Sequence, residues 1–383
     1  MTIFTQQMVI SSVLTGRKQR SVRALLYAFL CGSLVSCTGT KSLHVAPTGS
    51  DTNPGTRAEP VLTIARADSL ASPGYTIHVA PGIYRIDAPS PHAAGITTSR
   101  SGTASAHIRF VSSVKGAAKI IVSGTGIAWH SKGDYVDIDG FDISGSGRHG
   151  ILASGTNLTI TNNFIHDLTI SGGCTGAGGA AIDTDSPVGN VLIKDNVVRN
   201  IGYALLGSCN TVQGIYIASP SNAVTNNIVS RVAAVGITQW HGATGSTIVN
   251  NTVFHSKIGI LLGQGDAGTT TTGSENNYVA NNVVFCNKTY GIVEGGKMGT
   301  NNRYADNHVA RSGTNWSVKG NVNGAVSADP HLMKHQVQGA EDYHVPVALP
   351  AIGRNTPSRI STENQAGAVQ PHGVTFDAAG CDF

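Results

Sequence analysis

Four side chains of this chain are of the types that acid–base or metal chemistry uses. Asp183 and Asp185 are two residues apart, so in an extended segment both carboxylates point to the same side. Such a pair offers the hard oxygen ligands that Ca²⁺ prefers. His241 or Lys297 could act as a general base if burial or a neighbouring cation lowers its pKa. We therefore name Asp183, Asp185, His241 and Lys297 as candidate catalytic residues, and the two aspartates as candidate metal ligands.

A second set of side chains could hold a ligand. An aromatic side chain such as Trp240 can stack on a ligand ring, and short polar side chains near it can bind hydroxyl groups. The candidate binding residues are Tyr216, Gln239, Trp240, Gln264, Asp266 and Glu294. Glycines at 263, 265, 295 and 296 would leave a groove beside Trp240.

Each candidate also has a structural alternative. Asp183 and Asp185 can cap turns or order a loop, because carboxylates accept hydrogen bonds from backbone N–H groups. Trp240 and His241 can pack beneath the loop that follows Gly263. Lys297 can be a solvated turn residue. These alternatives stay open until the residues are placed in space.

The elements that must position these residues are repeats. A phrase of Asn-Asn or Asp-Asn followed by alternating apolar residues recurs at intervals of 24 to 33 residues. Its second residue is Asn163, Asn196, Asn227, Asn251, Asn282 or Asn307. A Gly-Ile or Ala-Ile pair is interleaved with it, and its isoleucines are Ile151, Ile182, Ile215, Ile237, Ile260 and Ile292. Two motifs locked at a period near 30 indicate stacked structural repeats.

Composition indicates what each repeat is made of. Charged residues are 13% of the chain and aromatic residues 6%, while glycines number 47. This favours short strands and turns over amphipathic helices. With three strands per repeat, each isoleucine stacks on the next in a dry core, and the residue after it faces outward. The outward column is then Leu152, Asp183, Tyr216, Thr238, Leu261 and Val293. One flank therefore gathers the candidate residues, and we expect the Asn pairs to be structural.

The fold predicted from these repeats is all-β: a right-handed parallel β-helix with three parallel sheets. We expect a lipoprotein signal peptide over 1–37, a linker and initial strand over 38–60, the β-helix over 61–325, and an irregular C-terminal segment over 326–383 that packs on the last coils. A short helix within 61–71 is expected to cover the first coil, because an uncapped solenoid presents an unpaired strand edge.

The first 37 residues have the features of an export signal. Four basic residues precede an apolar stretch from 24 to 35, and Cys37 follows small residues as in bacterial lipoprotein signals. The alternative is an ordinary secretory signal. Four of the 26 basic residues and none of the 22 acidic ones precede Cys37, so the rest of the chain has a formal net charge of zero. This gives no global basic field for nucleic acid.

Two cysteines are placed for a disulfide. Cys174 follows Asn163 by 11 residues, and Cys209 follows Asn196 by 13, so they occupy matching loops of successive repeats. In an exported protein they could join two neighbouring coils.

A resemblance to a known group supports this fold. The opening HVAPTGSDTNPGTRAEPVLTIARADSLASPGYTIHVAPGIYR, the phrase VDIDGFDISGS and the Asn pairs resemble the right-handed parallel β-helix superfamily of pectate-lyase-like proteins. The opening is similar to family 9 polysaccharide lyases, which act on pectate. Those lyases carry a catalytic lysine in a Gly-Phe-Lys-Leu-Gly-Gly phrase, whereas this chain has Gly-Ile-Val-Glu-Gly-Gly at 291–296. No catalytic residue is carried over from any family.

We therefore expect an exported β-helix protein that handles a polysaccharide, as a lyase or hydrolase of an acidic polymer. β-Elimination is favoured over hydrolysis, which needs two carboxylates about 5 Å or roughly 6.5–9.5 Å apart. The alternative is a non-catalytic cell-surface lipoprotein that binds glycan or is structural. Ca²⁺ is the possible cofactor. We expect a monomer that contacts membranes through a lipid anchor at Cys37, in the bacterial envelope or secreted, and does not bind nucleic acid.

Overall fold

The structure is a computed structural model that describes residues 41–170, 173–174, 178–184, 189–241, 243–264, 273–327, 333–337, 340–344 and 381. Cys37, Asp185 and Asp266 lie outside the described residues, so the expectations for the signal peptide and for these two acids are not placed by it. In the part of the chain that is described, no helix has the length and apolar character to span a bilayer.

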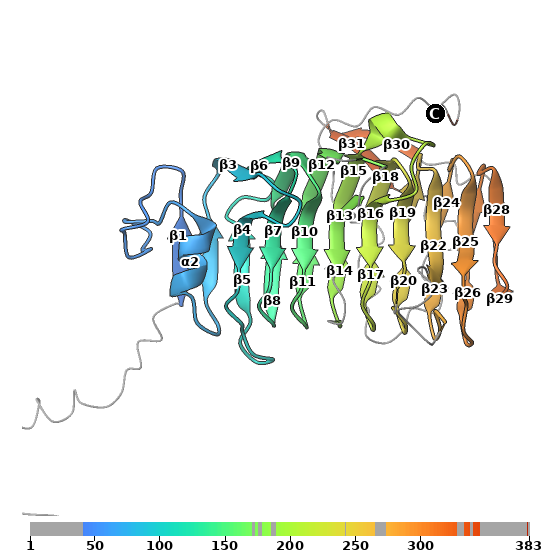
Figure 1. The fold of residues 1–383 in the computed structure, drawn as a ribbon, viewed down its shortest axis with the longest axis horizontal. Helices are drawn as coiled ribbons and strands as arrows, with labels where there is room; N and C mark the ends of the chain where they lie inside the picture. The colour runs from blue at the N-terminus through green and yellow to red at the C-terminus, as the bar shows by residue number, and fades with distance from the viewer. Residues whose placement is uncertain are drawn as a thin grey trace, which may run out of the picture. The chain divides into compact units, whose positions relative to one another are not determined.

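Three parallel sheets form most of the described chain, which passes through them in turn (Figure 1). Sheet A consists of β1 (Ser42–Val45), β2 (Thr76–Val79), β5 (Ile108–Ser112), β8 (Val136–Asp139), β11 (Thr159–Thr161), β14 (Leu192–Lys194), β17 (Ala223–Thr225), β20 (Thr247–Val249), β23 (Tyr278–Ala280), β26 (Arg303–Ala305) and β29 (Asn321–Asn323). Sheet B consists of β3 (Gly82–Ala88), β6 (Ala118–Gly124), β9 (Asp142–Gly147), β12 (Phe164–Ile170), β15 (Val197–Ile201), β18 (Ile228–Val232), β21 (Thr252–Phe254), β24 (Val283–Phe285) and β27 (His308–Ala310).

Sheet C carries the outward column expected from the repeats. It consists of β4 (Ala94–Thr98), β7 (Ile127–Ser131), β10 (His149–Ala153), β13 (Gly179–Thr184), β16 (Val212–Ile217), β19 (Val235–Gln239), β22 (Ile258–Gln264), β25 (Tyr290–Gly296) and β28 (Thr314–Ser317). Figure 1 shows these strands side by side in chain order. The predicted parallel β-helix with three sheets is confirmed.

Stacked isoleucines form the core beneath sheet C. Ile182 pairs in register with Ile151 on one side and Ile215 on the other, and the ladder continues through Ile237 to Ile260. All of these side chains are fully buried. The predicted inward column is confirmed, and it follows from the two-residue alternation of a strand.

The glycine before each isoleucine is explained by close packing between sheets. A Cβ atom at Gly236 would lie 2.4 Å from Cγ1 of Val253, and one at Gly259 would lie 2.4 Å from Cγ1 of Val284. Since atoms this close must move apart, any larger residue there would push sheet C away from sheet B. The glycine of the Gly-Ile motif is therefore required by the narrow corner where the chain enters sheet C.

The second asparagine of each Asn pair forms an internal ladder. Nδ2 of Asn227 donates to Oδ1 of Asn251 (3.0 Å) and to the carbonyl of Ile193 (3.0 Å). Its Oδ1 accepts from N and Nδ2 of Asn196, both at 3.0 Å. The ladder side chains are at most 1% exposed, so each amide satisfies buried polar groups that water cannot reach. These asparagines are structural, as expected.

The residue before each ladder asparagine turns the corner between sheets A and B. It is Asn162, Asp195, Asn226, Asn250, Asn281 or Asp306, with φ between 51° and 59°. Asn and Asp enter this left-handed region more readily than other non-glycine residues. Each half of the Asn pair thus has its own structural reason.

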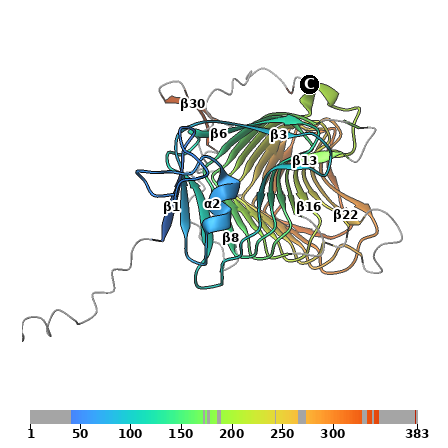
Figure 2. The ribbon, with the colours of Figure 1, turned by 60° about the vertical axis from the view of Figure 1, so that its left-hand side comes forward.

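A short helix covers the beginning of the coil stack. α2 (Ile64–Leu70) begins after Thr63, whose hydroxyl accepts from the N–H of Arg66 (3.1 Å), and Ile64 and Ala67 are buried. The buried carboxylate of Asp68 accepts from the N–H of Ser99 (2.9 Å), and burial raises the pKa of Asp68. Figure 2 shows α2 across the end where the stack begins. The predicted capping helix is confirmed.

Two disulfides join distant parts of the chain. Cys174 is bonded to Cys209, as the spacing predicts, beside the short 3₁₀ helix η1 (Tyr203–Leu205). Cys286 is bonded to Cys381, a pairing that the sequence analysis does not anticipate. The segment predicted to be irregular over 326–383 also contains an antiparallel hairpin, β30 (Met333–Val337) and β31 (Ala340–His344).

An ion-pair cluster on the outer face of sheet B makes stability depend on pH. The imidazole of His166 contacts Asp142 (3.1 Å) and Asp167 (2.7 Å). Burial disfavours the charged imidazole, but the hydrogen bonds to both carboxylates outweigh it and raise the pKa of His166 above its ordinary 6.5.

We expect the stability difference between the wild type and His166→Gln to depend on pH. A raised folded-state pKa contributes stability fully below 6.5, and this contribution is lost as the pH rises through the raised value. Urea unfolding on both sides of pH 6.5 measures the difference, with the exposed His92→Gln as control. A difference that stays constant or grows with pH would contradict this assignment.

Candidate functional site

The outward face of sheet C carries one column of register-paired residues. From the first coil to the last they are Thr97, His130, Leu152, Asp183, Tyr216, Thr238, Leu261, Val293 and Ser317. The column agrees with the one expected from the sequence. Polar and aromatic side chains occupy its middle, and apolar ones follow on β22 and β25.

Asp183 is the carboxylate in this column. Its side chain is 14% exposed, and Oδ2 lies 3.3 Å from Nδ1 of His149 on the neighbouring strand β10. Burial lowers the pKa of His149 to about 3, helped by the charges of Arg148 and His130. The imidazole is therefore neutral near pH 7, so this contact is not an ion pair.

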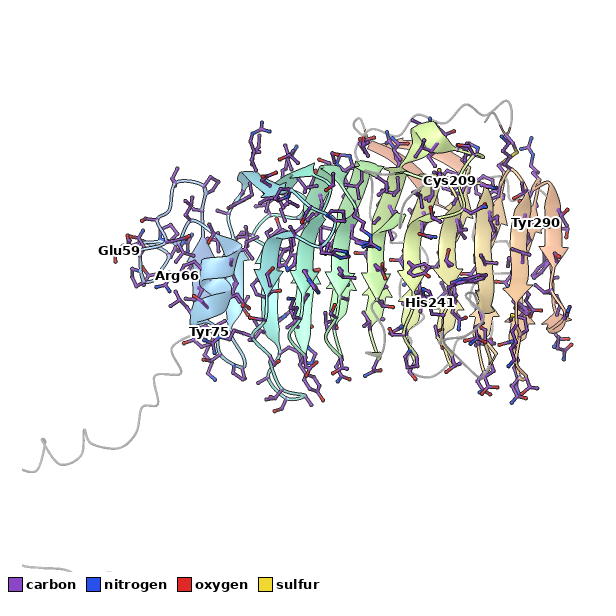
Figure 3. The ribbon with its side chains drawn as sticks, viewed as in Figure 1. Glu59, Arg66, Tyr75, Cys209, His241 and Tyr290 are labelled. Carbon is purple, nitrogen blue, oxygen red and sulfur yellow. A yellow bond between two sulfur atoms is a disulfide. The ribbon has the colours of Figure 1, made fainter. Side chains whose placement is uncertain are left out.

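Tyr216 and His241 complete a group with Asp183. Tyr216 is the register partner of Asp183 on the next rung, about 4.8 Å away. The ring of His241 lies edge-on to that of Tyr216, with centroids 5.9 Å apart and planes at 85°. Figure 3 shows His241 where β19 ends. All three side chains are partly exposed, so this group can meet a ligand.

The indole of Trp240 occupies the space expected to be a groove. A Cβ atom at Gly263 would lie 2.4 Å from Cζ3 of Trp240, and one at Gly295 would lie 3.5 Å from it. The glycines therefore accommodate the indole itself, which corrects the expectation of an open groove beside it. Trp240 remains partly exposed and borders the group of Asp183, Tyr216 and His241.

Two candidate binding residues point into the core instead. Gln239 has the same strand phase as Ile237 and is fully buried, where its Nε2 donates to the carbonyl of Ala243 (2.6 Å) and to Oδ1 of Asn277 (2.9 Å). Gln264 is 6% exposed. Both amides therefore face the core and not the outward side, because Gln239 lies two positions after the inward Ile237 and Gln264 four positions after the inward Ile260.

Glu294 and Lys297 are too far along the stack to act with Asp183. Four rungs separate β25 from β13, which is about 19 Å. Glu294 has the inward phase, and its carboxylate accepts from the hydroxyl of Tyr304 (2.8 Å) and the N–H of Lys319 (2.7 Å). It borders a cavity of about 490 Å³ beside β28. Lys297 is exposed after β25, so the structure does not bring either residue to the group on β13 and β16.

Comparisons with known proteins agree with this architecture. A family model described as "Right handed beta helix region" matches residues 94–253, and a second, "Protein of unknown function (DUF1565)", matches 47–89. Among solved structures, pectate lyase Pel9A superposes with a TM-score of 0.58 at 17% identity, over 75% of this chain and 76% of that one. The chain is a right-handed parallel β-helix.

Two further matches to this β-helix are enzymes by name. A rhamnogalacturonan lyase structure superposes with a TM-score of 0.56 at 15% identity, over 75% of this chain and 87% of that one. Pectate lyase L of Dickeya chrysanthemi is 27% identical over 151 residues. That match spans 37% of this chain and 36% of the enzyme, about a third of its length.

The sequence analysis missed two histidines of this face, His130 and His149. Nε2 of His130 lies 2.8 Å from Oγ of Ser154, and His149 contacts Asp183. The Gly-Ile pairs that predict the outward column do not reach His130, because its coil carries Ala128-Trp129 at the equivalent place. The signal available for His149 was its place directly before Gly150-Ile151.

The β-helix has no lysine at the position where the resemblance would place one. The third residue of the phrase at 291–296 is Val293, which lies in the outward column and is 8% exposed. A valine there can neither remove a proton nor carry positive charge. Any base on this face must therefore come from other side chains.

The described residues supply few oxygen ligands for Ca²⁺. Asp183 is the one described carboxylate of the outward column, and no group of three His, Cys, Asp or Glu side chains suited to a metal occurs in the described ranges. Ca²⁺ takes six to eight oxygen ligands. Asp183 alone does not fit a protein-built calcium site, and we derive no step through the ion.

Proposed function

We propose that this β-helix binds a linear acidic polysaccharide along the outward face of sheet C and cleaves it by β-elimination. The observation that carries the proposal is the grouping of Asp183, Tyr216 and His241 on adjacent rungs of one flank. The names of the relatives support the substrate class, since they include lyases of pectate and rhamnogalacturonan. A polymer lying along the stack would meet one rung about every 4.8 Å.

The chemistry assigns a role to each member of the group. β-Elimination removes the proton from the carbon next to the uronate carboxyl, forms a C=C bond and breaks the glycosidic C–O bond. A ring nitrogen of His241 can accept that proton, and the phenol of Tyr216 can donate one to the departing oxygen. Asp183 can hold His241, Tyr216 or a sugar hydroxyl in position through its carboxylate oxygens.

Hydrolysis is less well supported by the described part of this face. A glycosidase needs two carboxylates that flank one bond. Asp183 is the one carboxylate described in the outward column, and Glu294 is four rungs away. We assign Ca²⁺ no step in this proposal, because Asp183 alone does not fit a calcium site, and the screen below measures whether cleavage depends on the ion.

The second candidate function is glycan binding without cleavage. Val293 favours it, because the position of a lyase lysine is apolar. Such a protein needs the exposed rings of Tyr216 and Trp240 but not the carboxylate of Asp183. We also propose that the chain is an exported monomer anchored through Cys37, since disulfides such as Cys174–Cys209 are typical of oxidising compartments.

One screen separates these functions. The purified protein is incubated with polygalacturonate, rhamnogalacturonan, alginate and a neutral glucan, each with added Ca²⁺ or with EDTA. We expect ultraviolet absorbance from unsaturated products with one acidic polymer and none with glucan. New reducing ends without that absorbance would indicate hydrolysis. Binding without either product would favour the non-catalytic alternative.

A further inference from the structure

A basic edge runs along the corner between sheets B and C. Arg231 lies at this corner, at the position that Cys286 occupies on a later coil, and the two residues have similar φ values of 54° and 50°. Lys257 and Lys288 follow on adjacent coils: the N–H of Lys288 donates to the carbonyl of Ser256 (2.8 Å), and the next N–H donates to the carbonyl of Lys257 (2.8 Å). Two ammonium groups are thus carried by neighbouring rungs.

The charges of this edge are not neutralised by carboxylates of the described residues. Nζ of Lys257 donates to the carbonyl of Cys209 (3.2 Å) and to Oδ1 of Asn210 (2.7 Å), which are neutral acceptors. Arg231 stacks on the ring of Tyr203 at 4.2 Å. Lys288 is exposed, and among the described ranges no ion pair includes any of these three cations.

An exposed aromatic ring lies beside these lysines. Tyr290 is the first residue of β25, two residues after Lys288, and is 36% exposed. Few large apolar side chains among the described residues are as exposed. It pairs in register with Ile258, the residue after Lys257. An exposed ring next to unpaired cations suits a sugar that carries an acid group: the ring contacts the face of the sugar and the ammonium binds the carboxylate.

The edge lies apart from the group of Asp183. Strands of sheet C begin at this corner, and the outward column crosses β22 at Leu261, three positions after Ile258, or about 10 Å. Figure 3 places Cys209 and Tyr290 toward the edge where the strands begin and His241 toward the opposite edge. A ligand on the basic edge therefore need not touch the candidate catalytic group.

We propose that Lys257, Lys288 and Tyr290 form a subsite that binds uronate residues of an anionic polysaccharide beside sheet C. The substrate class rests on the proposed function, whereas binding at the edge is measured separately from cleavage. The chain after Cys37 has no net positive charge, so attraction to polyanions must be local to such an edge. Two lysines on adjacent rungs and one aromatic ring fit a short glycan segment. A nucleic acid would require a more extended basic surface.

The test compares Lys288→Gln and Tyr290→Ala with the wild type in binding to polygalacturonate and to its methyl-esterified form. Lys257 is left intact because its hydrogen bonds also hold the loop at Cys209. We expect Lys288→Gln to weaken binding of polygalacturonate about two- to five-fold at low salt and less at high salt. Tyr290→Ala should weaken binding of both polymers, and Lys288→Arg should retain the wild-type affinity.

The control is Lys119→Gln, which removes one exposed charge from β6, far from the edge in the coil order. Equal weakening by the control, unchanged binding by Lys288→Gln, or an equal loss with the methyl-esterified polymer would overturn the subsite. The subsite would also be overturned if duplex DNA bound the wild type as tightly as polygalacturonate does and lost as much affinity in Lys288→Gln. If no polymer is cleaved but binding still depends on Lys288, the proposed activity fails while the subsite stands.

Discussion

Replacing Asp183 with Asn is expected to lower the rate of unsaturated-product formation by about a hundred-fold or more. The substitution keeps the size of the side chain but removes its negative charge from the centre of the outward column. Because proton transfer contributes about 10²- to 10⁴-fold in such sites, a loss of this size follows if Asp183 positions the transferring groups. Initial rates of absorbance increase at saturating polysaccharide measure the effect.

The matched control is Ser317→Ala, which alters an exposed residue of the same column at the far end of the stack. It should leave the rate unchanged. Tyr216→Phe should lower turnover more than binding, because the ring remains while the proton donor is lost. A rate for Asp183→Asn equal to that of the wild type would remove this group from the reaction, whatever activity the protein has.

Replacing Asn227 with Ala is expected to destabilise the protein by several kcal/mol. The amide of Asn227 bonds Asn196, Asn251 and the carbonyl of Ile193, all in the buried interior. Alanine would leave these partners without hydrogen bonds, and each orphaned buried group costs about 1–3 kcal/mol. Bulk water does not reach these partners in the folded protein, since the ladder is at most 1% exposed. Urea unfolding followed by circular dichroism measures the difference.

Asn321→Ala is the control for the ladder, since Asn321 is exposed on β29 at the end of sheet A. Surface changes of this kind usually alter stability by less than about 0.5 kcal/mol. If both variants unfolded at the same urea concentration, the buried amides would not be a main source of stability. The comparison is direct because the two variants remove the same atoms.

The sequence predicts the columns of this β-helix because stacking gives the same position in every coil the same environment. The isoleucine column and the outward column therefore follow from the spacing of the Gly-Ile pairs alone. The same alternation also places Gln239 inside, two residues after Ile237, so choosing it for its chemical type conflicts with the rule that predicts the columns. Side-chain chemistry is informative here only after the phase of the strand is fixed.

Distance along the stack is what the sequence analysis does not resolve. Asp183 lies on β13 and Lys297 directly follows β25, yet the four rungs between their coils separate them by more than any side chain can bridge. Neighbours that lack the repeat motif are also lost, as with His130 and its contact to Ser154. The repeats predict which residues lie on this flank. Which of them lie close together depends on the number of rungs between their coils.

The disulfide between Cys286 and Cys381 closes a covalent ring, because it joins two residues that are 95 positions apart in the sequence. A protease that cuts the backbone once inside this ring would leave both fragments attached to each other. Such nicked molecules would keep their full mass until a reducing agent separated them. Non-reducing electrophoresis would therefore not distinguish such a nicked form from the intact protein by size.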